Sequence, residues 1–363
     1  MKRLSLAVLL LSVSFAAASQ TPVKLEFDLE MHATVVNDEY DASDAVLATS
    51  GTLPAVRMAP YLSLVFGEGS RISTGVNLCR DFGTPGVAPS AEWAVWYQLN
   101  RPVFTLAAGV FPRSLLKGEY STLILSDSRR FYDALLDGFL LQWNKGRSHY
   151  EIALDWNGKF DRSRREQFNV ITSGKGCVNS WISLNWEGMF HHYADSEEVW
   201  GVVDDHVLHP YMELDFAAFL PLQKLAVEAG PVLGYHFDRR KEDRRTSLGG
   251  LLSAEVRKWN VGIRNEAYYG GSQAPFYKSA DANGNIYGSD LYMRASLWQV
   301  TPESAPGFYD RAVIYWQPKV TQGVHLKLLV AAHFGNGGFL GSQQIVEAII
   351  DLHQLCLRWN KKH

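Results

Sequence analysis

Histidines, serines and carboxylates are the residues of this chain that could do chemistry, and their spacing matches no catalytic or metal-binding motif. His191 and His192 are adjacent, and the other histidines are scattered without the spacing of a zinc-protease helix. No serine stands in a Gly-x-Ser-x-Gly elbow. The stretch from Asp281 to Asn285 resembles the start of a calcium loop, but no glutamate follows where such a loop ends. We therefore expect no catalytic residue, no metal site, no cofactor and no enzymatic activity.

Charged and apolar side chains alternate strictly in the segment VKLEFDLEMH, residues 23–32. Successive side chains of a strand point to opposite faces, so this strand has one apolar face and one charged face. A soluble sheet would bury the apolar face, whereas a membrane barrel would turn it to lipid and the charged face to a water-filled lumen. Residues 150–156, 225–235 and 324–334 alternate in the same way.

The start of the chain predicts export. Basic residues precede a short apolar stretch from Leu4 to Phe15, and three alanines follow. Residues 1–18 are therefore expected to be a signal peptide that is cleaved near Ser19. No later segment has the run of apolar residues that a transmembrane helix needs. No change of composition divides the remainder, so residues 19–363 are expected to form a single domain.

Composition narrows the class of protein further. Three cysteines form no disulfide framework. Removal of the signal peptide takes Lys+Arg from 35 to 33 against 38 acids, so the net charge moves from -3 to -5 and does not suggest nucleic-acid binding. Aromatic residues make up 12% of the chain, which suits a barrel with aromatic girdles at the membrane boundaries.

Sixteen segments are predicted as strands, and short and long connections alternate between them. An up-and-down outer-membrane barrel has this pattern, with short periplasmic turns, long external loops and an even number of strands. We therefore predict an all-β, transmembrane, up-and-down antiparallel barrel in the cell outer membrane, with about sixteen strands, or eighteen if residues 286–299 form an extra hairpin. The predicted strands are 23–32, 55–66, 71–79, 91–99, 103–111, 137–144, 148–156, 166–173, 179–190, 209–218, 223–237, 246–257, 261–270, 309–319, 323–334 and 344–359.

With the apolar faces against lipid, charged side chains of both signs share the lumen wall. Acids and bases must largely pair there across strands, which would brace a wide barrel. An unpaired remainder would set the ion selectivity of a pore. The charged residues expected on the lumen wall are Lys24, Glu26, Asp28, Glu30, Glu151, Asp155, Arg257, Arg264, Arg311 and Lys327.

Residues 106–158 carry a more specific pattern. A strand ends in Phe-Pro, a long connection follows, and a later strand ends in Asn-Gly. This pattern resembles the phosphate-selective porin O/P family of sixteen-stranded porins, in which a strand reading Gly-x-Phe-x-x-Pro leads into the third loop. The matching residues are Gly109, Phe111, Pro112, Gly138, Asn157 and Gly158.

The resemblance implies that residues 112–136 fold into the lumen as a constriction loop. The apolar residues of this segment would pin it to the barrel wall. Its basic residues would line the narrowest point and favour anions, but acids lie among them, so phosphate selectivity does not carry over. The charged residues expected at the constriction are Arg113, Lys117, Glu119, Asp127, Arg129, Arg130 and Asp133.

Two functions from different classes remain open. The first is a porin-like channel for passive diffusion of ions or small hydrophilic solutes, for which a barrel of this size has room. The second is a surface-binding or adhesion protein that uses the long 271–308 loop. The aromatic residues of that loop are Tyr277, Tyr287, Tyr292 and Trp298.

Outer-membrane proteases and phospholipases are the enzymatic alternative. Alternation places histidines and aspartates on barrel walls by chance, so the sequence does not separate a catalytic pair from a wall pair. The expected partners are ions or small solutes and outer-membrane lipid, without nucleic acid, and the porins that the chain resembles suggest a homo-trimer.

Overall fold

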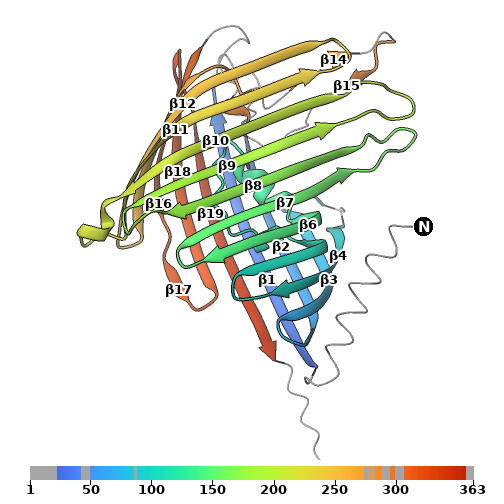
Figure 1. The fold of residues 1–363 in the computed structure, drawn as a ribbon, viewed down its shortest axis with the longest axis vertical. Helices are drawn as coiled ribbons and strands as arrows, with labels where there is room; N and C mark the ends of the chain where they lie inside the picture. The colour runs from blue at the N-terminus through green and yellow to red at the C-terminus, as the bar shows by residue number, and fades with distance from the viewer. Residues whose placement is uncertain are drawn as a thin grey trace, which may run out of the picture.

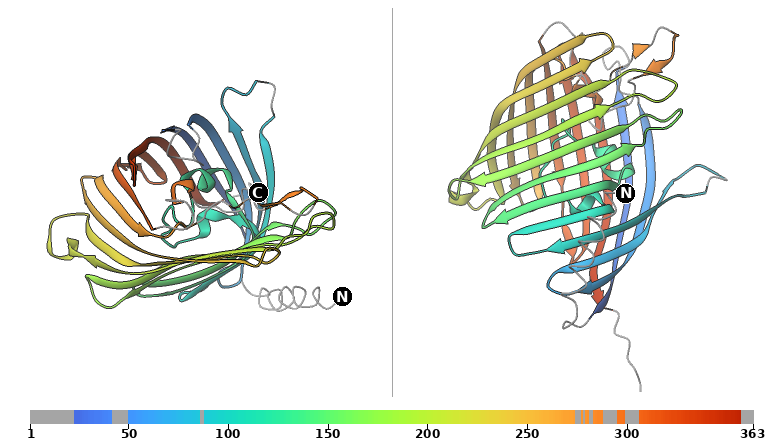
Figure 2. Two further views of the ribbon diagram at one scale, coloured as in Figure 1. Left: turned by 90° about the horizontal axis from the view of Figure 1, so that it is seen from above. Right: turned by 45° about the vertical axis from the view of Figure 1, so that its right-hand side comes forward.

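The strands, in which apolar and polar side chains alternate, close into an antiparallel barrel of 16 strands. Figures 1 and 2 show its arrangement. The computed structural model describes residues 23–41, 50–85, 88–273, 277, 279–280, 283–287, 295–298 and 306–356. The predicted signal peptide lies outside these residues. The barrel strands are β1 (Lys24–Tyr40), β2 (Gly51–Phe66), β3 (Ser70–Asp81), β4 (Ser90–Asn100), β5 (Phe104–Pro112), β6 (Leu135–Lys145), β7 (Ser148–Gly158), β8 (Gln167–Cys177), β9 (Ile182–Tyr193), β10 (Val203–Asp215), β11 (Lys224–Asp238), β12 (Asp243–Lys258), β13 (Val261–Gly270), β16 (Gly307–Trp316), β18 (Val324–Gly335) and β19 (Gly338–Cys356).

The barrel closes where the first strand meets the last. β1 pairs with β2 and also with β19, in both cases antiparallel, so no strand of the wall is left with an open edge. Closure matters in a membrane because lipid offers no hydrogen-bond partner to an unpaired backbone group. A short strand, β17 (Lys319–Thr321), lies in the connection between β16 and β18 and pairs with β18. This architecture confirms the predicted fold class.

The strands turn apolar side chains outward and polar side chains inward. On β18, Leu328 and Val330 are 41% and 48% exposed on the outer face. On the inner wall, the carboxylates Glu151 and Glu187 are only 3% and 2% exposed. This distribution inverts that of a soluble protein and fits lipid outside and water inside. No helix in the described ranges is long and apolar enough to cross a membrane.

The two ends of the barrel differ in their connections. We call the end that carries residues 113–134, 159–166 and 194–202 the long-loop end, and the other the short-turn end. Long loops face the outside of the cell in outer-membrane barrels. Two connections at the long-loop end are tighter than the sequence predicts, because β11 meets β12 through 239–242 and β18 meets β19 through 336–337. At these two connections the strands continue beyond the apolar band of the barrel. Outward side chains in this part of a strand need not be apolar, so polar residues and glycines can still belong to it.

Residues 113–134 fold back from the end of β5 into the lumen (Figure 2). We call this segment the inner loop. It contains a short 3-10 helix, η2 (Arg113–Leu115), and one helical turn, α2 (Asp127–Tyr132). The Ser126 hydroxyl caps α2 by accepting a hydrogen bond from the backbone N–H of Arg129 at 3.3 Å.

A second segment, residues 295–298, packs against the inner loop. The backbone N–H of Ala295 donates to the carbonyl of Thr122 at 3.0 Å, and the indole of Trp298 donates to the Thr122 hydroxyl at 3.2 Å. Apolar residues from both segments and from the inner wall form one buried cluster, the lumenal apolar layer. Its members are Tyr120, Leu123, Ile124, Leu125, Ile171, Met189, Val207, Val232, Leu251, Tyr268, Leu297, Trp298, Tyr309 and Leu340.

The aromatic residues of the 271–308 loop that the structure describes are not exposed. Trp298 belongs to the lumenal apolar layer, while Tyr277 and Tyr287 are buried and both donate to a carboxylate oxygen of Asp238, at 2.6 and 2.8 Å. Burial and this hydrogen bond raise the pKa of Tyr277 above its ordinary value. An exposed recognition surface built from these three side chains is therefore wrong, and Tyr292 lies outside the described residues.

The described part of the predicted extra hairpin at 286–299, residues 286–287 and 295–298, is not part of the barrel wall. The strand β15 (Ile286–Tyr287) pairs with β14 (Ser279–Ala280) in a separate small sheet, and residues 296–298 form a 3-10 helix, η4 (Ser296–Trp298). The barrel therefore has the sixteen strands of the first prediction and not the eighteen of its alternative.

We predict that Gly109→Ala destabilises the barrel by about 1–3 kcal/mol, the usual cost of a strained backbone position. Gly109 has a φ of +125°, and an added Cβ would lie 2.3 Å from the carbonyl oxygen of Val95. Gly250→Ala is the matched control, because an added Cβ there meets no atom within 4 Å. Urea unfolding in lipid vesicles would measure both, and equal midpoints for the two variants would contradict the prediction.

Candidate functional site

The inner loop is held by carboxylates of the barrel wall. Both oxygens of Glu151 on β7 accept hydrogen bonds, from the backbone N–H groups of Lys117 and Gly118 at 2.9 and 2.8 Å, from the Tyr120 hydroxyl at 2.6 Å and from Gln142 at 2.8 Å. A buried carboxylate requires such a complete set of donors. Glu151 therefore fixes the descent of the inner loop.

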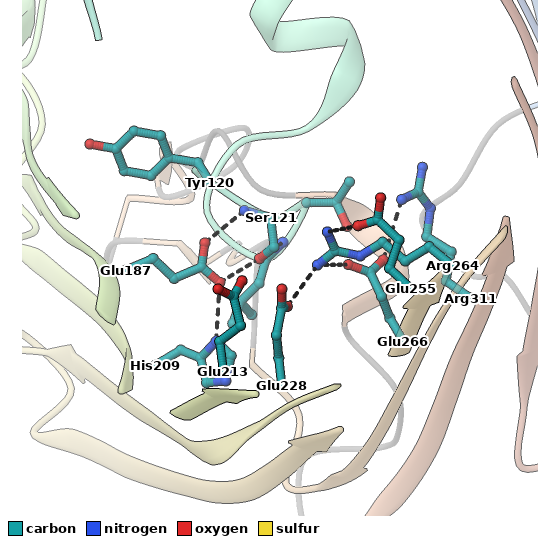
Figure 3. Close-up of polar contacts among 12 residues, drawn as sticks. Tyr120, Ser121, Glu187, His209, Glu213, Glu228, Glu255, Arg264, Glu266 and Arg311 are labelled. Carbon is teal, nitrogen blue, oxygen red and sulfur yellow. Dashed lines mark hydrogen bonds and ion pairs between the residues drawn. The ribbon is translucent and has the colours of Figure 1, made fainter. Parts of the chain in front are cut away.

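Glu187 on β9 holds the next turn of the inner loop (Figure 3). It accepts from the backbone N–H and the hydroxyl of Ser121, both at 2.6 Å, and lies 3.2 Å from Nδ1 of His209. This trio is not a hydrolytic triad, because the Ser121 hydroxyl donates to the carboxylate and makes no hydrogen bond with the imidazole. We assign it to the anchoring of the loop.

Arg113 anchors the start of the inner loop. Its guanidinium lies 2.9 Å from Asp155 on β7 and 3.2 Å from Asp133 at the other end of the loop. It also donates to the carbonyls of Asp133 and Leu135, at 2.7 and 3.2 Å. Arg113 thus ties both ends of the inner loop to one buried carboxylate on the wall.

A cavity of about 560 Å³ lies between the inner loop and the wall from β9 to β18. It runs from Thr122 and Leu251 at the lumenal apolar layer to Arg257 and Gln317 beside the turns of the short-turn end. Its wall is an ion-pair network (Figure 3). Its pairs include Arg264 with Glu228, Glu255 and Glu266 at 3.3, 3.7 and 3.2 Å, Lys224 with Glu255 at 3.4 Å, Arg311 with Glu266 and Asp127 at 3.3 and 3.2 Å, and Lys327 with Glu347 at 3.1 Å.

A second cavity of about 260 Å³ lies on the other side of the inner loop, against β1, β2 and β19. Glu30, Arg57, Arg113 and Arg130 are among its lining residues, and the Ser114 hydroxyl donates to Glu30 at 2.7 Å. The two cavities share Gly118, Tyr120 and Arg130 in their linings.

The structure divides the seven residues that the sequence places at a constriction. Glu119, Asp127 and Arg130 line the larger cavity, and Arg113 and Arg130 line the smaller one. Lys117, Arg129 and Asp133 line neither of these cavities. Among the described residues, Arg129 and Arg130 make no ion pair within 4.0 Å, and Arg130 donates instead to the backbone carbonyl of Tyr120.

The residues that the sequence places on the lumen wall lie on the inner face of their strands. Within the described ranges, five of the ten form ion pairs across strands, namely Glu26, Asp28, Arg264, Arg311 and Lys327. Asp28 and Glu26 share Arg71, at 2.7 and 3.6 Å. Whether this network selects ions stays a prediction. No group of three or more histidines, cysteines or carboxylates in the described part of the chain has the arrangement of a metal site.

A second polar cluster lies on the outer face of the barrel at the long-loop end. Strand register aligns one outward side chain from each of six consecutive strands, β7 to β12, and we call this set the rim row. Each member stands near the end of its strand at the long-loop end. The rim row is Trp156, Phe168, His192, Asp204, Phe237 and Arg244.

His192 and Asp204 form the centre of the rim row. Nδ1 of His192 lies 2.6 Å from a carboxylate oxygen of Asp204, and the side chains are 23% and 9% exposed. Phe168 packs on the imidazole at 4.9 Å between ring centroids. The second oxygen of Asp204 accepts from Nε of Arg239 at 2.8 Å. The other ring nitrogen of His192, Nε2, makes no hydrogen bond among the described residues. The imidazole faces the lipid side.

The other histidines on the described strands lack this combination. His206 also points outward, between Phe190 and Tyr235, but has no carboxylate partner among the described residues. His209 and His236 have carboxylate partners, at 3.2 and 3.0 Å, but both are buried inside the barrel. A histidine that is activated by a carboxylate and open to lipid therefore occurs at His192.

These features define an outer-membrane barrel of porin-like architecture. The fold is similar to that of OmpTdeltaL8, a loop L8 deletion mutant of the outer membrane protein OmpT of Vibrio cholerae, with a TM-score of 0.54 and 8% identity over 91% of this chain and 99% of that chain. It is also similar to OpdO of Pseudomonas aeruginosa, with a TM-score of 0.50 and 10% identity over 91% of this chain and 97% of that chain.

A family model described as lipid A 3'-O-deacylase-type matches residues 17–209, more than half of the chain, and the protein belongs to this family. A search of curated proteins finds no match. The expected membership of the phosphate-selective porin O/P family is not confirmed by these comparisons. The expectation of no enzymatic activity is wrong, because the family is named for an outer-membrane enzyme.

Sequence reasoning missed the rim row because it depends on the register between strands. The sequence signal for this site was a double of adjacent histidines on one strand and a double of adjacent aspartates on the next. His191 and His192 lie next to the end of β9, which is Tyr193, and Asp204 and Asp205 follow the first residue of β10, Val203. Alternation sends one member of each double to the lumen and the other to the lipid side, so each face receives one histidine and one aspartate. Register pairs His192 with Asp204.

We predict that Glu151→Gln loosens the inner loop. Both carboxylate oxygens accept hydrogen bonds, so an amide nitrogen in either place would face N–H donors. Loss of charge-assisted hydrogen bonds of this kind corresponds to about tenfold or more faster amide exchange. Hydrogen exchange with mass spectrometry would measure the amides of residues 117–121. Glu68→Gln at the short-turn end is the control, and unchanged exchange in Glu151→Gln would contradict the assigned anchor.

Proposed function

We propose that this protein hydrolyses an ester-linked acyl chain of lipid A at the outer wall of the barrel. The observation that carries the proposal is the His192 and Asp204 pair, which faces lipid at the long-loop end. Family membership supports the reaction, because the family is described as lipid A 3'-O-deacylase-type. A lipid substrate presents its ester bonds at the boundary between headgroup and acyl chains, and this is the level of the rim row.

The rim row supports a water-mediated hydrolysis. Asp204 holds the Nδ1 tautomer of His192, so that Nε2 can accept a proton from water. The water oxygen attacks the acyl carbonyl carbon, the bond to the sugar oxygen breaks, and the imidazolium returns the proton to that oxygen. The products are a free fatty acid and a sugar hydroxyl. Trp156 and Phe168 continue the row and offer an apolar surface to the acyl chain, with ring centroids 5.2 Å apart.

We predict that His192→Asn reduces acyl release by about 100-fold or more, the usual contribution of a general base. Asp204 is a positioning residue, so Asp204→Asn is expected to give a smaller loss and to shift the pH profile of the reaction. Mass spectrometry of lipid A after incubation with the folded barrel in vesicles would measure the rate.

His206→Asn is the matched control for this experiment. It removes a neighbouring outward histidine that has no carboxylate partner, and it should leave the rate near that of the wild type. Heat-modifiable migration in gels would verify that each barrel is folded. An unchanged rate in His192→Asn would contradict the assigned base, and a wild-type barrel that releases no acyl chain would overturn the proposed function.

A second candidate function is restricted passage of ions or small hydrophilic solutes through the lumen. The observation that favours it is the shared lining of the two cavities, which leaves Gly118, Tyr120 and Arg130 between them. The inner loop would then act as a filter, with Arg130 as the cation that both cavities share.

In planar bilayers, this second candidate predicts discrete current steps and a reversal potential that depends on Arg130. Arg130→Gln should shift selectivity towards cations, because Glu119 and Asp127 remain beside it. Arg129→Gln on the same helix lines neither cavity and should leave the reversal potential unchanged. A barrel that inserts without current steps would contradict passage.

We retain three further sequence predictions as part of the proposal. Residues 1–18 act as a cleaved signal peptide, residues 19–363 form the single barrel domain, and copies of the barrel assemble as homo-trimers. Outer-membrane lipid is both the proposed substrate and the medium that surrounds this barrel. Nucleic acid is not an expected partner.

A further inference from the structure

We propose that Arg244 binds a phosphoryl group on the headgroup of the lipid that lies beside His192. Arg244 is exposed at the start of β12, and its guanidinium carbon lies 4.4 Å above the centre of the Phe237 ring. Among the described residues it makes no ion pair with a carboxylate. It lies outside residues 17–209, the segment that the family model matches.

Two of the three neighbouring arginines form ion pairs with carboxylates, and the third, Arg240, donates to the carbonyl of Trp200 at 2.8 Å. Arg239 lies 2.7 Å from Asp204, and Arg245 lies 2.5 Å from Asp243. Arg244 points to the lipid side, whereas Arg245 follows it on the opposite face of the strand. Arg240 belongs to the turn, whereas Arg244 stands on β12, so Arg244 is the arginine whose place on the strand turns it to lipid headgroups.

The stacked guanidinium is suited to a phosphoryl group. A guanidinium offers paired N–H donors to phosphate oxygens, and the Phe237 ring below holds its plane. Basic side chains at this level of a membrane are attracted to anionic headgroups. The ring contact leaves the edges of the guanidinium open for these hydrogen bonds.

Register sets the distance between this cation and His192. Phe237 pairs with Asp204 and with Arg244, and Asp204 pairs with His192, so three strand spacings separate the two ends. At 4.7–4.9 Å for each spacing, the backbone positions of Arg244 and His192 are about 14 Å apart along the wall, and because the guanidinium stacks on Phe237 of the intervening strand, the cation itself is about 10–14 Å from His192. A broad headgroup of linked sugar rings spans this distance, whereas a phosphoryl group beside the ester on a small glycerol headgroup does not. The inferred ligand is a phosphorylated glycolipid.

The inference rests on the proposed function for the place of the lipid, so its test measures binding separately from hydrolysis. Folded His192→Asn barrel in detergent would be mixed with lipid A, or with the same lipid A after phosphatase treatment. Native mass spectrometry would then measure the retained lipid. We expect about fivefold greater retention of the phosphorylated form, as one basic residue near a membrane surface provides.

Arg244→Gln on this background should lower retention to that of the dephosphorylated lipid. Lys258→Gln is the matched control, because Lys258 also stacks on an aromatic ring, at 4.5 Å from the centre of Trp259, but at the short-turn end of the same strand. Equal retention of both lipids, or unchanged retention in Arg244→Gln, would overturn the inference. Phosphate-dependent retention by a barrel that releases no acyl chain would support the inference while the proposed hydrolysis fails.

Discussion

The pairing of β1 with β19 is the constraint on which the other features depend. It gives each strand of the wall two neighbours and thereby satisfies the backbone in lipid. Closure also fixes the parity of every strand, since a shift by one residue would exchange its lumenal and lipid faces. His191 and His192 illustrate the effect. The first bonds to Asn169 inside the barrel at 2.5 Å, and the second bonds to Asp204 on the outside.

The interior of the barrel combines two kinds of packing that serve the inner loop. Carboxylates of the wall bind the backbone of its descending part, and the lumenal apolar layer covers residues 123–125. Charged groups line the space between this layer and the short-turn end, where Arg264 forms ion pairs with three carboxylates. The lumen is therefore a structured interior that stiffens the wall from β7 to β13. A rigid wall holds the side chains of the rim row at fixed spacing on its outer side.

Much of the fold could be predicted from the sequence because alternation is a local property. The charged positions of residues 23–32 and of the later strands show which side chains face the lumen and which face lipid. The alternation of short and long connections indicates the number of strands. The tight turns at 239–242 and 336–337 were missed because charged residues and glycines can continue a ladder beyond the apolar band. Tyr277 and Tyr287 were expected at the surface because their partner, Asp238, is distant in sequence.

The candidate sites could be predicted only in part. Alternation indicates that His192 and Asp204 share a face of their strands, but the contact between them depends on the register of β9 against β10. The alignment of Arg244 with this pair depends on two further registers. Register is set by turns and by packing of the whole wall, so single-strand patterns do not contain it. The charged residues of the inner loop were recognisable, but their division between two cavities follows from the anchoring carboxylates.

The central claim is that acyl chemistry takes place on the outer wall at the rim row. A lipid A analogue with a photoreactive group in place of the 3' ester would test this most directly. After irradiation of the folded barrel in vesicles, mass spectrometry would identify the modified peptides. The account predicts adducts at outward positions of β8, β9 and β10 around His192. Adducts confined to lumenal residues such as Glu187, or to the outer face of strands remote from β9, would contradict it.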